Sequence, residues 1–164
     1  MSEAVVFLIN AATATQIADH LLSCDMQFVP RLSGRVDVAS YAVKIVERAV
    51  RFEAWHDGAL IGLVAAYSGP DEHRAAFITS VSVLADWSRR GIGTRLLRDC
   101  VAYAAQLRLP GVRLEVNDQN RSAIRLYERL GFSSREARGE STYMHLDLQR
   151  STDDGGDELT WRKR

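Results

Sequence analysis

The sequence predicts one α/β domain with a mixed, mostly antiparallel central sheet flanked by helices. The middle of the chain reads as an antiparallel meander, because Val50–His56 and Ala59–Ser68 are extended patterns on either side of the hairpin signal Asp57-Gly58. Beyond the meander, helical and extended patterns alternate, which is typical of an α/β fold. With 164 residues, of which 46% are hydrophobic and 26% charged, the chain can form a core of ordinary size. We expect this domain over residues 1–150.

The N-terminal part is predicted to hold one strand and two helices. Val5–Ile9 is a continuous apolar run of strand length, which suits a buried strand. Thr13 or Thr15 can cap a first helix, and Asp37 can cap a second over Val38–Ala49. The residues expected on the inward faces of these helices are Ile17, Ala18, Leu21, Leu22, Tyr41, Ile45 and Val46.

The rest of the chain is predicted to continue the meander and then to alternate helices with strands. The expected elements are a strand over Ala76–Val83, a helix from Gly91 to Leu107, a strand over Val112–Asn117, a helix from Asn120 to Gly131, and a hairpin of Phe132–Arg138 with Ser141–Leu148. The tail, residues 151–164, is acidic and shows no packing pattern, so we expect it to be disordered.

Composition excludes several classes of protein. Twenty-one basic residues balance 21 acidic ones, so bulk charge does not indicate a nucleic-acid partner. Cys24 and Cys100 have no metal-ligand spacing and lie in apolar helical patterns, which favours reduced packing residues. No stretch approaches a membrane span, and the N-terminus lacks the features of a signal peptide, so we expect a cytoplasmic protein without a membrane partner. The sequence leaves open whether the protein forms a homodimer.

A polar loop between an extended run and a helical pattern is the main candidate binding site. Its sequence is Ser88-Arg89-Arg90-Gly91-Ile92-Gly93-Thr94. Backbone N–H groups at a helix N-terminus attract anions, and glycine lets a phosphate approach the backbone closely. The arginines around the turn are Arg89, Arg90, Arg95 and Arg98. The loop therefore predicts a pyrophosphate site.

Two common phosphate motifs do not fit this loop. A dinucleotide fingerprint needs a third glycine, where this chain has Leu96, and it follows the first strand of a βαβ unit. A P-loop needs Gly-Lys-Ser/Thr, and the loop contains no lysine. Considered alone, the loop could also be a helix start with a packing glycine.

A second motif changes the interpretation. The stretch Asn120-Arg121-Ser122-Ala123-Ile124-Arg125-Leu126-Tyr127-Glu128-Arg129-Leu130-Gly131-Phe132, together with the loop, closely resembles the Gcn5-related N-acetyltransferase (GNAT) superfamily. That superfamily carries (Gln/Arg)-x-x-Gly-x-(Gly/Ala) at its coenzyme A pyrophosphate loop, followed by an Asn-x-x-Ala-x-x-Leu-Tyr-x-x-x-Gly-Phe helix. The resemblance is tight over residues 76–132, and it implies a sheet splayed at the coenzyme A site. Ser88 departs from the Gln/Arg position, which puts a side-chain contribution there in doubt.

The resemblance implies roles for particular residues, with acetyl-CoA as co-substrate and no metal. Backbone groups of Val81 and Val83 would pair with the pantetheine amides. Asn120 would hydrogen-bond the pantetheine arm, and the Tyr127 hydroxyl would act as general acid for the leaving thiolate. A core tyrosine with a satisfied hydroxyl is the alternative for Tyr127. The residues expected to hold the pyrophosphate are Arg89, Arg90, Gly91, Ile92, Gly93 and Thr94.

The general base is less well defined by the sequence. The strand before the loop carries no acid, and Glu115 is the best replacement, twelve positions before Tyr127. A glutamate at this offset is the assigned base in family members that acetylate ribosomal-protein N-termini. An ion pair of Glu115 with Arg113 or a helix arginine is the alternative, and so is a water-relayed base or an amine that arrives neutral. The histidines are less favoured: His20, His56, His73 and His145.

The acceptor is framed in this family by the segment between the first two helices and by the last hairpin. In this chain these are Met26–Arg35 and 138–143, where Phe28, Arg31 and Tyr143 are the candidate acceptor residues. Phe28, with Pro30 and Leu32, could form an apolar wall, and Arg31, with Arg35, could recognise an acidic or phosphorylated acceptor. These arginines could equally be solvated loop residues.

Three functions follow from this interpretation. The first is an N-acetyltransferase that moves an acetyl group directly from acetyl-CoA to an amine of a small molecule or amino sugar. The second is a peptide or protein N-acetyltransferase of the N-terminal amine type. The third is an acyl-CoA-binding module with little turnover. Neutral charge disfavours a tRNA acceptor.

Overall fold

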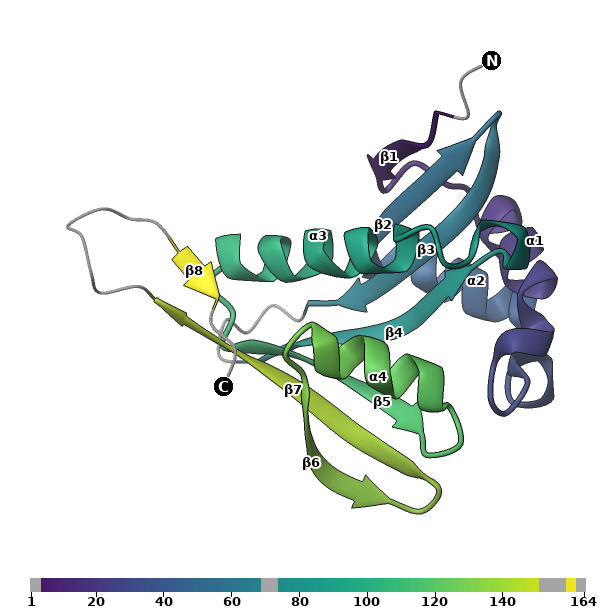
Figure 1. Cartoon of the computed structure of the whole chain (residues 1–164). Helices are drawn as coiled ribbons and strands as arrows, with labels where there is room; N and C mark the ends of the chain where they lie inside the picture. Colours follow the sequence, from purple (N-terminus) through teal and green to yellow (C-terminus); the bar gives the residue numbers. More distant parts are fainter. Residues whose placement is uncertain (1–3, 69–73, 151–158, 162–164) are drawn as a thin grey trace. The chain divides into compact units, whose positions relative to one another are not determined.

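The structure is a computed structural model that describes residues 4–68, 74–150 and 159–161 (Figure 1). The chain forms two compact units. Unit 1 comprises Met1–Tyr67 and Thr79–Leu97, and unit 2 comprises Ser68–Ile78 and Arg98–Arg164. The loop expected around residues 69–73, which includes His73, lies outside the described residues.

The strands of unit 1 follow the order β1-β2-β3-β4. Strand β1 (Val6–Ile9) pairs antiparallel with β2 (Ala49–His56), and β2 pairs antiparallel with β3 (Ala59–Tyr67). The turn between β2 and β3 places both Asp57 and Gly58 at positive φ, as expected for the Asp-Gly hairpin signal. The last strand is β4 (Ala76–Val83), whose residues from Thr79 onward belong to unit 1.

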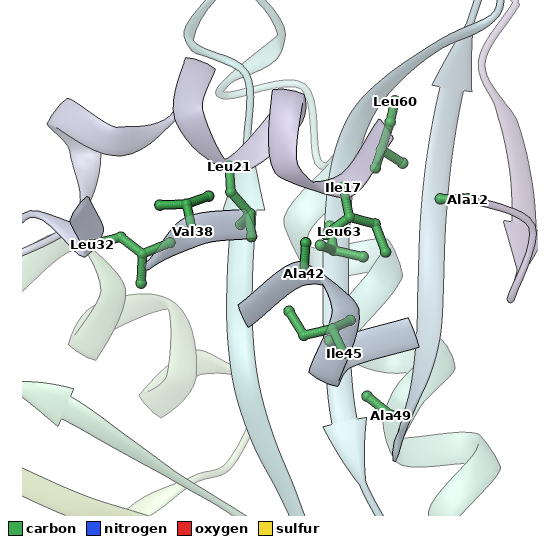
Figure 2. Close-up of a cluster of buried hydrophobic side chains, with 11 residues drawn as sticks. Ala12, Ile17, Leu21, Leu32, Val38, Ala42, Ile45, Ala49, Leu60 and Leu63 are labelled. Carbon is green, nitrogen blue, oxygen red and sulfur yellow. The ribbon is translucent and has the colours of Figure 1, made fainter. Parts of the chain in front are cut away.

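Two helices pack their buried side chains into the core of unit 1. Helix α1 (Ala14–Ser23) begins at a capping box of Thr13 with Gln16, and α2 (Val38–Arg48) begins at Asp37, whose carboxylate accepts from the backbone N–H of Ser40. Figure 2 shows the side chains of both helices meeting those of β3. The buried cluster comprises Ala12, Ile17, Leu21, Leu32, Val38, Ala42, Ile45, Ala49, Leu60, Leu63 and Ala65.

Two burial expectations for unit 1 are wrong. Strand β1 is not buried, because it pairs with β2 alone at the edge of the sheet, and Val6, Leu8 and Ile9 are 52%, 42% and 56% exposed. Leu22 does not join the inward face of α1, and its side chain is exposed. A continuous apolar run does not distinguish a central strand from an edge strand, since that difference depends on distant pairing partners.

A buried charged network in unit 1 was not foreseen from the sequence. Glu53 on β2 is fully buried, and its carboxylate accepts from the backbone N–H groups of Ala11 and Ala12 and from Arg51. Trp55 donates to it through Nε1 at 3.1 Å. The network satisfies the buried charge and connects β2 to the segment that precedes α1.

Unit 2 has the strand order β4-β5-β7-β6. Ala76–Ile78 of β4 pair in parallel with β5 (Gly111–Asn117). The other pairs are antiparallel, between β5 and β7 (Ser141–Arg150) and between β7 and β6 (Ser133–Arg138). Helix α4 (Arg121–Arg129) is followed by its C-cap Leu130 and by Gly131, whose positive φ of 102° is typical of a glycine just after a helix. Helix α3 (Ile92–Gln106) begins in unit 1 and continues in unit 2.

The two faces of the unit 2 sheet differ in character. Val112, Leu114 and Val116 of β5 are buried, as are Met144 and Leu146 of β7. The side chains that alternate with them are exposed or half-buried and polar or aromatic: Arg113, Glu115, Asn117, Tyr143 and His145. This alternation confirms the predicted pattern of β5 and leaves a polar sheet face.

The predicted disordered tail is described only in part. Leu159–Trp161 form a short strand, β8, that pairs antiparallel with Leu148–Arg150 of β7. Residues 151–158 and 162–164 lie outside the described residues. Within the described ranges, no helix has both the length and the apolarity needed to span a membrane.

Candidate functional site

The predicted pyrophosphate loop has the geometry of an anion site. Arg89 and Gly91 adopt positive φ of 64° and 80°, and the first intrahelical bond of α3 runs from the N–H of Arg95 to the carbonyl of Gly91. The backbone N–H groups of Ile92, Gly93 and Thr94 therefore lie in the first turn, where no intrahelical acceptor exists. A pyrophosphate fits such a helix start, since N–H groups and the macrodipole both favour negative charge.

The side chains of the loop are held locally. The Ser88 hydroxyl donates to the carbonyl of Ala85 at 2.7 Å. Ser88 therefore stabilises the turn before the helix, in the position where the family pattern has glutamine or arginine. The guanidinium of Arg90 stacks on the Trp87 ring at 4.6 Å, and Trp87 in turn packs on His56. This stack holds the guanidinium end of the exposed Arg90 side chain over the Trp87 ring.

Strand β4 presents alternate backbone groups to opposite sides. The N–H of Leu84, the residue that follows β4, donates to the carbonyl of Ile61 on β3. In a regular antiparallel pair, adjacent residues direct their backbone groups to opposite sides. By this alternation we expect the backbone groups of Val81 and Val83 to point away from β3, which is the orientation that pairing with pantetheine requires. On the same side, the Tyr41 hydroxyl donates to the carbonyl of Thr79 at 2.8 Å.

Tyr127 lies in unit 2 on α4 and is 7% exposed. Its ring packs at a tilt on Phe132, with 6.0 Å between centroids. Burial raises the pKa of Tyr127 to about 12, so the phenol stays neutral at physiological pH. In the part of the chain that the structure describes, its hydroxyl has no hydrogen-bond partner. A neutral phenol of this kind is available as a hydrogen-bond donor.

Asn120 begins helix α4. Its Oδ1 accepts from the backbone N–H of Ala123 at 3.4 Å, so the amide caps the helix that carries Tyr127. The same amide is the predicted contact to the pantetheine arm. Helix capping uses the oxygen and leaves the Nδ2 donors for such a contact.

Glu115 lies on the polar face of β5 and is exposed. Ser141 donates a hydrogen bond from Oγ to its Oε1. Among the described residues Glu115 has no cationic partner within ion-pair distance, so the alternative of an ion pair with Arg113 or a helix arginine finds no support. The carboxylate is accessible and oriented by a neutral donor, as a base requires.

The segment between α1 and α2 is organised around Asp25. Its carboxylate accepts from the backbone N–H and the hydroxyl of Ser33 and forms an ion pair with Arg31 at 3.0 Å. These hydrogen bonds lower the pKa of Asp25. Arg31 is therefore engaged inside its own loop. Phe28 and Leu32 contribute to the unit 1 core, as a half-buried and a buried side chain respectively.

Tyr143 is the centre of a different cluster in unit 2. It stands opposite Glu115 in the β5–β7 register. The guanidinium groups of Arg113 and Arg138 both lie 6.0 Å from its ring centroid, and Arg138 also donates to its hydroxyl at 3.1 Å. The Arg113 guanidinium also lies over the Phe77 ring, 5.3 Å from its centroid. The hydrogen bond from Arg138 to the Tyr143 hydroxyl raises the pKa of Arg138.

A buried histidine in unit 1 joins three elements. His20 on α1 is 3% exposed, and its Nδ1 donates to the carbonyl of Leu60 on β3 at 2.9 Å. Because a carbonyl only accepts, the neutral ring then accepts at Nε2 from the Ser82 hydroxyl on β4, at 2.8 Å. The Cys24 thiol lies 3.8 Å from the same nitrogen. Burial lowers the pKa of His20 and raises that of Cys24 to about 11.

This histidine predicts a pH dependence of stability. Because the folded-state pKa of His20 lies below the unfolded value of about 6.5, protonation of His20 favours unfolding. The contribution of His20 to the free energy of unfolding is therefore complete above about pH 6.5. It decreases as the pH falls below that value, by up to about 1.4 kcal/mol per pH unit. Denaturant unfolding between pH 5 and 8 measures this slope. Substitution His20→Gln should reduce the slope without abolishing it, because burial also lowers the pKa of His145. An unchanged slope would contradict the assignment.

Several contacts of the site could not be predicted from the sequence. They are the hydrogen bond from Ser141 to Glu115, the ion pair of Arg31 with Asp25, the stacking of Arg90 on Trp87, and the contacts of Arg113 and Arg138 with the Tyr143 ring. The alternation of β5 and β7 could have indicated a shared face, but their register was needed to place Tyr143 opposite Glu115. The described residues contain no cluster of His, Cys, Asp or Glu side chains suited to a metal ion.

Comparisons of sequence identify the family. A model of the acetyltransferase (GNAT) family matches residues 16–132. The chain is 34% identical over 86 residues to the probable N-acetyltransferase camello of Xenopus tropicalis, covering 52% of this chain and 39% of that protein. It is also 34% identical over 84 residues to an uncharacterised N-acetyltransferase of Methanocaldococcus jannaschii, covering 49% and 37%. The chain thus spans less than half the length of these relatives.

Solved structures share the fold. The ribosomal-protein-S18-alanine N-acetyltransferase of Escherichia coli superposes with a TM-score of 0.68 at 20% identity, covering 91% of this chain and 98% of that chain. Arabidopsis thaliana NAA60 in complex with acetyl-CoA gives 0.66 at 20% identity, covering 88% and 98%. These likenesses confirm the predicted α/β fold with its mixed, mostly antiparallel sheet. The chain therefore belongs to the acetyltransferase (GNAT) family, whose co-substrate is acetyl-CoA.

Proposed function

We propose that this protein is an acetyl-CoA-dependent N-acetyltransferase that moves the acetyl group directly to an amine of a small molecule or amino sugar, with residues 1–150 as its catalytic domain. The observation that carries the proposal is the helix start at Gly91–Thr94, within a chain of this family. Its N–H groups suit the pyrophosphate of acetyl-CoA. Arg89 and Arg90 add charge, and Val81 and Val83 supply backbone groups for the pantetheine.

The chemistry assigned to Glu115 is removal of a proton from the acceptor amine, directly or through one water. A neutral amine then attacks the thioester carbonyl, a C–N bond forms, and the C–S bond breaks. Ser141 keeps the Glu115 carboxylate oriented by donating to Oε1. The proton taken from the amine before the attack passes from Glu115 to solvent. The proton that the nitrogen loses as the amide forms is balanced by the one that the departing thiolate takes up from solvent.

The role assigned to Tyr127 is donation of a hydrogen bond to the leaving sulfur. With a pKa of about 12, the phenol is a weaker acid than an ordinary thiol, whose pKa is about 8.5. Tyr127 therefore stabilises the thiolate mainly by hydrogen bonding. This refines the general-acid role that the family resemblance implies for Tyr127.

Release of free thiol from acetyl-CoA, measured across a panel of amines, tests the proposal. We expect the rate to rise with at least one small amine or amino sugar and to stay near background without an acceptor. Peptides with free N-termini belong in the panel, because the offset of Glu115 from Tyr127 resembles that of enzymes acting on ribosomal-protein N-termini. Tight coenzyme A binding with no response to any amine would instead favour an acyl-CoA-binding module.

A further inference from the structure

Two arginines on the polar face of unit 2 have no carboxylate partner among the described residues. Arg113 and Arg138 contact the Tyr143 ring, and neither has a carboxylate within ion-pair distance in those ranges. Other arginines differ in this respect: Arg135 pairs with Asp147, and Arg31 with Asp25. Within the described ranges neither Arg113 nor Arg138 forms such a close pair, although Glu115 and Glu136 both attract the Arg138 charge from a greater distance.

The two guanidinium groups are also held in place. Arg113 lies over Phe77 as well as Tyr143, at 5.3 Å and 6.0 Å from the two ring centroids. Arg138 donates to the Tyr143 hydroxyl at 3.1 Å. Stacking on aromatic rings reduces the conformational freedom of an arginine while its N–H donors stay exposed, which is the arrangement that binds carboxylate or phosphate well.

Both arginines lie near Glu115 on the sheet. Arg113 and Glu115 lie two residues apart on the same face of β5, about 7 Å along the strand. Tyr143 stands directly opposite Glu115, and Arg138 stands opposite Ser141, the residue that binds the Glu115 carboxylate. Glu115, which can receive an amine, and the two arginines, which can bind an anion, thus lie next to each other on one face of the sheet.

We infer that the acceptor carries an anionic group, a carboxylate or a phosphate, within a few bonds of its reactive amine, and that Arg113 and Arg138 bind this group. The inference rests on the proposed function, because Glu115 is taken to receive the amine. It moves acceptor recognition from Arg31, which Asp25 engages, to the two arginines around Tyr143. Glu136 also faces Tyr143 in the β6–β7 register, and both Glu115 and Glu136 attract the Arg138 charge, so the pair must outweigh two nearby carboxylates.

Matched acceptor pairs that differ only in the anion test the inference. Suitable pairs are glucosamine 6-phosphate with glucosamine, β-alanine with its amide, and peptides that begin Ala-Glu or Ala-Gln. We expect kcat/KM to favour the anionic member of at least one pair by about tenfold or more, as for one charge-assisted hydrogen bond. The preference should shrink as salt is raised. The pair that shows the preference indicates whether the anionic group of the acceptor is a phosphate, a small-molecule carboxylate or an acidic side chain of a peptide.

Variants identify the groups responsible. Arg113→Gln and Arg138→Gln should each remove most of the preference, because kcat/KM falls more for the anionic member of the pair than for the neutral member. Arg113→Lys keeps the charge and should retain part of the preference. Arg125→Gln is the matched control, because Arg125 is exposed on α4, outside the polar sheet face. Equal rates for both members of every pair, or equal losses for both members in the variants, would overturn the inference while N-acetylation itself stands.

If no amine in the panel is acetylated, the proposed function fails, and binding decides the inference separately. Signals of the Nε–H groups of Arg113 and Arg138 in ¹⁵N spectra of the whole chain report on anion contact. Shifts caused by glucosamine 6-phosphate and absent with glucosamine would support the anion site. No shift with either compound would overturn it.

Discussion

Replacing Glu115 by glutamine is expected to lower kcat/KM for amine acetylation by about 10²- to 10⁴-fold, the range for loss of a positioned base. Glutamine keeps the size of the side chain and can still accept from Ser141, so the sheet face should remain intact. The loss should shrink as the pH rises toward the pKa of the acceptor, because an amine that arrives neutral needs the base less. Steady-state rates across a pH series measure both effects.

Two controls belong with this variant. Glu128→Gln changes an exposed carboxylate on α4 and is expected to leave kcat/KM within about twofold. Ser141→Ala removes the donor to Oε1 and should give a smaller loss than Glu115→Gln, about tenfold, since it affects only the orientation of the carboxylate. If Glu115→Gln retained the rate and pH profile of the wild-type enzyme, Glu115 would have no part in the mechanism.

Replacing Tyr127 by phenylalanine is expected to lower kcat by about 10²- to 10³-fold, which is the usual effect of removing one donor to a developing negative charge. Phenylalanine fills the same space beside Phe132, so folding should be preserved. Affinity for coenzyme A should change little, because its main contacts are assigned to the Gly91–Thr94 loop and to β4. Single-turnover kinetics together with a binding isotherm for coenzyme A separate these two quantities.

A matched control for Tyr127 is Tyr103→Phe, since Tyr103 lies half-buried on α3 outside the proposed machinery. Wild-type turnover in Tyr127→Phe would assign the residue to packing alone. A loss of coenzyme A affinity equal to the loss of rate would place Tyr127 in donor binding instead of in the chemical step.

Local signals in the sequence account for most of the fold. Capping residues and glycines place helix ends within a residue or two, as Asp37 does for α2 and Gly131 for α4. Alternation identifies β4 with both ends correct and β5 within one residue. The edge position of β1 could not be foreseen in this way, because it depends on which strands stand beside it.

The candidate site was foreseen only where a motif describes it. The loop around Gly91 and the helix that carries Tyr127 belong to motifs, and their predicted positions agree with the structure. Contacts that join distant segments were not foreseen, such as Ser141 with Glu115, 26 residues apart, or His20 with Ser82, 62 residues apart. Arg31 shows the same limit, since a loop arginine that looked available for a substrate pairs with Asp25.

The most direct test of the central claim follows the acetyl group itself. The chain is incubated with acetyl-CoA labelled in the acetyl group and with the amine that gives the highest thiol release, and the product is analysed by mass spectrometry. The account predicts a labelled amide on the acceptor amine in a one-to-one ratio with free coenzyme A, and a large loss of both in Glu115→Gln and Tyr127→Phe. Release of thiol without a labelled amide, or no release above background with any amine, would contradict it.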